Sequence, residues 1–140
     1  MAKVLIPFTD PESAERAVRR LLDEPRSPAL EVELLAVVEP LTPGKVGIFL
    51  SPKRAEALSR AAVARWIAQI GALLDAANVS YRAEIAIGRA ADLIGAALHR
   101  ADIDRVLLPA AAPHWWSAAT AGWQSARLTR ATHHPVTVVP

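Results

Sequence analysis

The sequence predicts an α/β domain built on a parallel sheet, and three observations support this prediction. Short apolar runs typical of strands alternate with longer segments whose apolar residues recur at helical spacing. The first run, Lys3–Phe8, is almost uninterrupted in its apolar character, as expected of a strand buried on both faces. The chain has 140 residues, 52% of them hydrophobic and 21% charged, which fits one globular domain over residues 1–140.

The first half of the chain contains two predicted strands and one predicted helix. Asp10 is a typical N-cap residue, and Pro11 suits the first helical position, so a helix begins directly after the first strand. Pro25 and Pro28 end this helix. A second strand is predicted over Val32–Val38, and the Pro- and Gly-containing segment Leu41–Leu50 is predicted to be a loop.

The second half repeats the alternation of helices and strands. The longest helix is predicted from Ser51-Pro52 to about Ala77, with Asn78 as its stop signal. Its predicted apolar stripe contains Leu58, Ala62, Trp66, Ile70, Leu73, Leu74 and Ala77. The later elements are predicted at Ser80–Ile87 (strand), Ala90–Ala101 (helix), Arg105–Leu108 (strand), 122–132 (short helix) and Pro135–Val139 (strand).

A ligand site is expected at the carboxyl ends of the strands. In open α/β sheets, ligands bind where the strand order reverses. If the first strand is central, the loops 9–12 and 109–121 flank that point. The second loop leads into a helix N-terminus at Gly122, which attracts anions through its unpaired N–H groups. The architecture therefore predicts an anion or nucleotide pocket.

Four segments resemble the universal stress protein family: KVLIPFTDPESAERAV, LLAVVEP, AEIAIGRAADLI and SARLTRATHHPVTVV. This resemblance covers essentially the whole chain. It implies a Rossmann-like, nucleotide-binding type of fold, with a five-stranded parallel sheet in the order 3-2-1-4-5 and helices on both faces. It also implies a homodimer paired through the last strand, here 135–139. Many members of the family bind ATP and others do not.

The ATP-binding members carry Gly-x2-Gly-x9-Gly-Ser/Thr after the fourth strand, and this chain departs from that pattern. Gly122 matches the last glycine, whereas Pro109 and Ala112 replace the first two and Trp123 replaces the hydroxyl residue. Proline has no N–H group, alanine adds a Cβ, and an indole cannot replace the hydroxyl as a phosphate ligand. The pocket implied by the family comprises Pro7, Thr9, Asp10, Val38, Pro109, Ala112, Gly122, Trp123 and Gln124.

Thr9 stands where the family has an aspartate at the end of the first strand, and Asp10 follows one position later. Three of the four tryptophans lie within nine residues, Trp115, Trp116 and Trp123. They form a partner-docking patch, a plug in the pocket, or ordinary packing of a loop on the core.

Two other site chemistries are disfavoured. His114, His133 and His134 do not have the spacing of a zinc site and lack a further ligand nearby. A hydrolase could combine Ser117 or Ser125 with His114 and Asp10, but no nucleophile elbow surrounds either serine.

We therefore expect a homodimeric stress-linked regulatory or binding protein that is not an enzyme and has lost or weakened ATP binding. The alternative is an ATP-binding protein with a variant pocket and slow hydrolysis. No cofactor or metal is expected, and the +2 net charge without a Lys/Arg run predicts neither nucleic-acid nor membrane binding. This interpretation includes a protein partner at the Trp115/Trp116 loop. The N-terminus has no signal-peptide pattern, so a cytoplasmic location is expected.

Overall fold

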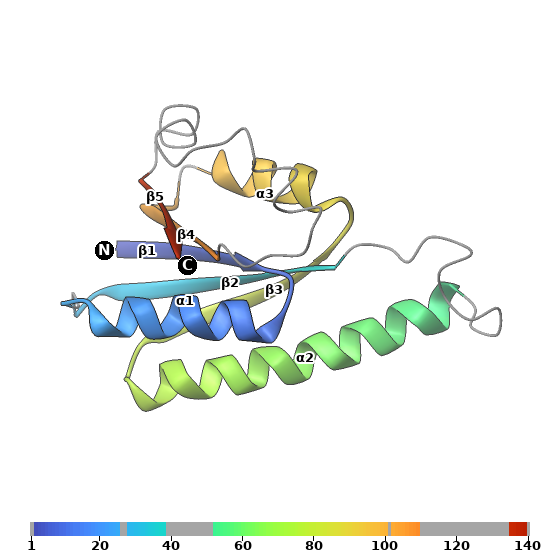
Figure 1. Ribbon diagram of the computed structural model, residues 1–140, viewed down its shortest axis with the longest axis horizontal. Coiled ribbons are helices and arrows are strands. Elements are labelled where there is room, and N and C mark those ends of the chain that lie inside the picture. The colour runs from blue at the N-terminus through green and yellow to red at the C-terminus, as the bar shows by residue number, and fades with distance from the viewer. Residues whose placement is uncertain (1, 26–27, 39–51, 101, 110–134, 140) are drawn as a thin grey trace.

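The strands form one parallel sheet in the order β3-β2-β1-β4-β5, which confirms the predicted topology (Figure 1). The computed structural model describes residues 2–25, 28–38, 52–100, 102–109 and 135–139. The elements are β1 Ala2–Phe8, α1 Pro11–Asp23, β2 Leu30–Val38, α2 Pro52–Ala76, β3 Ser80–Ile87, α3 Ala90–Leu98, β4 Arg105–Pro109 and β5 Val136–Val139.

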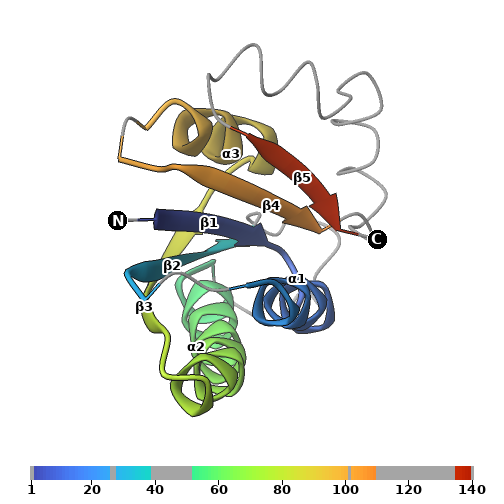
Figure 2. The ribbon, with the colours of Figure 1, turned by 90° about the vertical axis from the view of Figure 1, so that its left-hand side faces the viewer.

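Helices cover both faces of the sheet, with α1 and α2 on one face and α3 on the other (Figure 2). Alternate residues of each strand point to opposite faces, so each central strand contributes side chains to two cores, one on each face of the sheet. Ile6 and Phe8 of β1 belong to the core under α1 and α2, whereas Leu5 belongs to the core under α3. Both faces of β1 are therefore buried, which explains why its sequence is apolar almost throughout.

Local sequence signals set the ends of α1 and α2. The Asp10 side chain accepts a hydrogen bond from the Ser13 backbone N–H, and Pro11 stands in the first turn, as predicted. Asn78 has a φ of +57°, the left-handed conformation that asparagine tolerates better than most residues. It directly follows the last turn of α2, which confirms Asn78 as the stop signal.

The apolar stripe predicted for α2 is confirmed for its second half and wrong at Leu58. Ile70 and Leu74 are buried, and Trp66 packs against the core while remaining partly exposed. Leu58 is 54% exposed. The reason is length: α2 has 25 residues, and its first turns extend past the ends of the strands (Figure 1).

Helix α3 ends at Leu98, three residues earlier than the predicted Ala101. The N–H groups of His99 and Arg100 donate to the carbonyls of Ala96 and Ala97, at 3.2 Å in both cases. Hydrogen bonds between residues three positions apart, instead of four, are typical of the last turn of a helix.

Candidate functional site

The carboxyl edge between β1 and β4 is where the strand order reverses. From β1 the sheet continues to β2 and β3 on one side and to β4 and β5 on the other. The parallel register pairs Leu5 with Val106, and each strand continues three residues further, to Phe8 and to Pro109. The predicted site residues Thr9 and Asp10 thus follow β1 next to the end of β4.

The ladder between β1 and β4 stops before this edge. It joins only Val4 to Arg105 and Leu5 to Val106, whereas the β1–β2 ladder runs from Ala2 to Phe8. Pro7 in β1 and Pro109 at the end of β4 have no N–H group, so neither can extend the ladder by donating to the neighbouring strand. Both prolines are buried, and they leave this part of the sheet poor in backbone donors.

Asp10 caps the start of α1 with both of its carboxylate oxygens. Its Oδ1 accepts from the Ser13 backbone N–H at 2.8 Å, and its Oδ2 accepts from the Ser13 hydroxyl at 2.7 Å. Ser13 is 2% exposed, so this pairing is held inside the fold. Both carboxylate oxygens of Asp10 therefore serve the helix cap.

Val38, the last residue of β2, also has a partner within the fold. Its carbonyl accepts from the Gly88 N–H at 3.0 Å, which joins the ends of β2 and β3. Gly88 has a φ of +156°, a conformation that side-chain-bearing residues rarely adopt. The backbone turn after β3 thus depends on this glycine.

The remaining predicted site residues, Ala112, Gly122, Trp123 and Gln124, lie outside the described residues. The same holds for Trp115, Trp116, Ser117, Ser125 and the histidines 114, 133 and 134. Within the described ranges, no group of three or more His, Asp or Glu side chains could hold a metal ion. In the same ranges, no helix is both long and apolar enough to cross a membrane.

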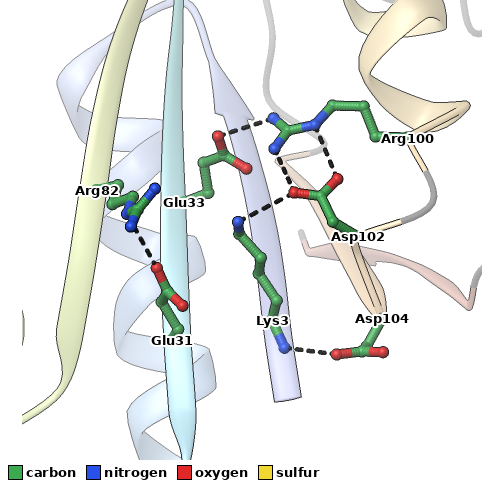
Figure 3. A network of polar contacts seen from close by, with 7 residues as sticks. All are labelled: Lys3, Glu31, Glu33, Arg82, Arg100, Asp102 and Asp104. Atoms are coloured by element: carbon green, nitrogen blue, oxygen red, sulfur yellow. Dashed lines mark hydrogen bonds and ion pairs between the residues drawn. The ribbon is translucent and has the colours of Figure 1, made fainter. Parts of the chain in front are cut away.

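The opposite, amino edge of the sheet carries a polar network that the sequence did not reveal (Figure 3). Arg100 donates to Glu33 Oε1 at 2.7 Å, and its other nitrogens donate to Asp102 at 2.6 and 3.1 Å. Lys3 Nζ donates to Asp102 at 3.1 Å. These bonds join β1, β2 and the segment after α3.

The hydrogen bonds and charges in this network favour the ionised forms of Asp102 and Arg100. Hydrogen bonds from Arg100 and Lys3 hold the pKa of Asp102 far below its usual value. Hydrogen bonds to Asp102 and Glu33 raise the pKa of Arg100. Glu33 is 7% exposed, and its buried Oε2 has no hydrogen-bond partner. Asp102 and Asp104 both accept hydrogen bonds from Lys3, Asp102 from its Nζ and Asp104 from its backbone N–H, which indicates a structural role.

The universal stress protein family model matches residues 1–140, so the chain belongs to this family. A search of curated proteins found no match. Among solved structures, the chain resembles a universal stress protein family member from Burkholderia pseudomallei, with 15% identity, a TM-score of 0.71, and coverage of 99% of this chain and 96% of that chain.

Two further solved structures are similar. The UspA protein from Lactobacillus plantarum has 18% identity and a TM-score of 0.65, and the match covers 99% of this chain and 97% of that one. A family member from Arabidopsis thaliana, solved with AMP bound, has 18% identity and a TM-score of 0.68, with coverage of 99% and 91%. At these identities the likeness establishes the fold, which is the one described above.

Proposed function

We propose that this chain is a regulatory or binding member of the universal stress protein family in which ATP binding is lost or much weakened. The observation that carries this proposal is Pro109 at the end of β4, next to the point where the strand order reverses. A phosphate held at such an edge is bound chiefly by backbone N–H groups, and proline has none. Ala112 and Trp123 remove two further features of the family's phosphate loop.

The proposed role is binding rather than catalysis. Each oxygen of the Asp10 carboxylate accepts one hydrogen bond from Ser13, which holds the side chain at the start of α1 in a capping role rather than a catalytic one. The expectations of no cofactor, a cytoplasmic location and a protein partner at the Trp115/Trp116 loop remain predictions.

A homodimer paired through β5 is part of the proposal. β5 is the last strand of the sheet, and its outer side is an edge at which a second copy can pair. Its sequence, VTVV, is short, apolar and rich in β-branched residues, which favours such pairing.

The second candidate is a nucleotide-binding protein with a variant pocket and slow hydrolysis. Gly122 retains one glycine of the ATP-binding pattern, and the similar Arabidopsis protein was solved with AMP bound. Calorimetric titration of the purified chain with ATP, ADP and AMP separates the two candidates. Weak or absent binding supports the main proposal, and low-micromolar binding with ATP turnover supports the second.

A further inference from the structure

The outer side of β3, called the β3 edge below, is the second end of the sheet. β3 pairs with β2 on one side, and no strand lies on its other side within the residues that the structure describes. β3 has 8 residues and β5 has 4, so β3 offers the longer edge. The middle of β3, from Arg82 to Glu84, is exposed. An exposed edge of this length can pair with a strand of another chain.

The direction of the backbone groups decides which residues can pair at the β3 edge. The Gly88 N–H donates to the Val38 carbonyl, so the backbone of Gly88 faces β2. Backbone groups alternate in direction along a strand, and the register between β2 and β3 runs without interruption. The odd-numbered residues of β3 therefore point their N–H and C=O groups away from β2. In the middle of the strand these residues are Tyr81, Ala83 and Ile85.

Arg82 and Glu84 give the β3 edge a self-complementary charge pattern. Both side chains lie on the face opposite to Tyr81, which packs against the core under α1 and α2. The Arg82 side chain is 77% exposed and forms an ion pair of 3.3 Å with Glu31 of β2 (Figure 3). Glu84 is exposed and forms no ion pair in the described part of the chain. When two copies of β3 run antiparallel about Ala83, Arg82 of each copy lies opposite Glu84 of the other.

We propose that the β3 edge pairs antiparallel with the β3 edge of a second copy of this chain, in the register centred on Ala83. In this register Ala83 pairs with its own copy and Tyr81 pairs with Ile85, and each pair exchanges N–H···O bonds. Arg82 and the partner's Glu84 fall between these pairs, in the arrangement that brings opposite side chains closest together. The two faces of the joined strands thus carry an aromatic–aliphatic pair and an ion pair, respectively.

The β3 contact goes beyond the proposed β5 dimer and is weaker than it. β5 is apolar, whereas β3 has charges at its centre, and exposed ion pairs contribute little individually. A single strand pair also buries a small area, which is typical of transient association. The β3 contact is therefore expected only at chain concentrations of roughly 0.1–1 mM, where β5 dimers join edge to edge.

Sedimentation equilibrium of the full chain with Val138→Lys isolates the β3 contact, because the lysine disfavours pairing through β5. The mass is expected to rise from monomer toward dimer between roughly 20 µM and 1 mM. Raising NaCl to about 0.5 M should weaken this association about three-fold, because salt screens the ion pairs. A mass that stays monomeric up to roughly 1 mM would overturn the proposal.

Exchange of the two charges assigns the association to this register. In the same background, Arg82→Glu and Glu84→Arg each set like charges opposite one another and should weaken association about ten-fold. The double exchange Arg82→Glu/Glu84→Arg restores complementarity and should recover the association. Arg19→Glu is the matched control, because it makes the same change of charge and breaks an exposed ion pair with Glu15. It should alter the association by less than about two-fold.

A double exchange no better than the single variants, or equal effects of Arg82→Glu and Arg19→Glu, would overturn the proposal. Failure of the β5 dimer can be told apart from failure of the β3 contact. If Val138→Lys is still a dimer at roughly 20 µM, the β5 dimer is wrong. The charge exchange then decides whether the β3 edge forms that dimer.

Discussion

Arg105 and Glu24 form two parallel hydrogen bonds between the sheet and α1. Arg105 Nη1 donates to Glu24 Oε2 at 2.6 Å, and Nη2 donates to Oε1 at 2.9 Å. Glu24 is the C-cap of α1, and Arg105 is the first residue of β4. On the other face of the sheet, Arg100 joins β2 to the segment after α3 through its hydrogen bonds to Glu33 and Asp102. Hydrogen-bonded ion pairs therefore hold the elements together on both faces of the amino edge.

The pair formed by Arg105 and Glu24 predicts an acid-dependent loss of stability. The hydrogen bonds from Arg105 lower the pKa of Glu24 below its ordinary value of 4.5. Because the folded pKa is lowered, the pair stabilises the fold above about pH 4.5, and this stabilisation is lost as the pH falls through the folded pKa. Glu24→Gln should cost about 1 kcal/mol at pH 7 and progressively less in acid.

Urea unfolding from pH 7 to pH 3 measures this difference between wild type and Glu24→Gln. Glu15→Gln is a suitable control, since Glu15 forms an exposed pair with Arg19 within α1 and should cost less than about 0.5 kcal/mol. A difference between wild type and Glu24→Gln that does not change with pH would contradict the assigned role.

Loss of Arg100 alone should be more damaging than loss of Arg100 together with its partner Glu33. Arg100→Leu leaves the buried Glu33 carboxylate without its cation, which should cost about 3 kcal/mol. The double variant Arg100→Leu/Glu33→Leu removes the unpaired charge and should regain most of that stability. Chemical denaturation of the three proteins checks this order, and a double variant no more stable than Arg100→Leu would disprove the explanation.

Gly71 and Gly95 should respond in opposite ways to alanine. A Cβ at Gly71 of α2 would collide with the phenol ring of Tyr81 on β3, whereas a Cβ at Gly95 of α3 meets no atom within 4 Å. Gly71→Ala should destabilise the fold by about 2 kcal/mol, because the Tyr81 ring must give up its packing on α2 or the helix and strand must separate. Gly95→Ala should stabilise it by up to about 1 kcal/mol through helix propensity.

Thermal unfolding of the two alanine variants checks these opposite signs. Tyr81→Val in the Gly71→Ala background removes the ring and should recover part of the loss. If Gly71→Ala were neutral or stabilising, the close packing of Tyr81 on α2 would be refuted.

The proposed dimer predicts that a charge within β5 produces monomers. Val138→Lys introduces an ammonium group into the short apolar strand at the sheet edge, where lysine disfavours edge-to-edge pairing. Light scattering of the variant should give the monomer mass of about 15 kDa, compared with the dimer mass for wild type. An unchanged dimer mass would place the interface elsewhere.

The sequence predicted elements whose signals are local. The cap at Asp10 and the stop at Asn78 depend on neighbouring residues, and the third strand was predicted with its observed bounds, Ser80–Ile87. Helical periodicity shows which face of α2 is apolar, but it cannot show how far the sheet extends beneath it. This is why the exposure of Leu58 was not foreseen.

Contacts between residues that are far apart in the sequence could not be predicted from the sequence alone. Arg100 and Glu33 are 67 positions apart, and Arg105 and Glu24 are 81 apart, so no spacing pattern connects them. At the candidate site, Asp10 was predicted both as a helix cap and as a pocket residue. The structure adds that the Ser13 hydroxyl donates to the second carboxylate oxygen of Asp10, so both oxygens take part in the cap.

Calorimetric titration of wild type and of the variant Pro109→Gly/Ala112→Gly/Trp123→Ser with ATP tests the central claim most directly. The variant restores the three residues at which the chain departs from the ATP-binding pattern. Wild type should give no saturable heat at ATP concentrations of roughly tens of micromolar. The variant should gain measurable affinity, because it regains the N–H group at position 109, loses the Cβ at position 112 and regains a hydroxyl at position 123. A low-micromolar dissociation constant for wild type, or ATP retained through its purification, would contradict the claim that this chain has lost nucleotide binding.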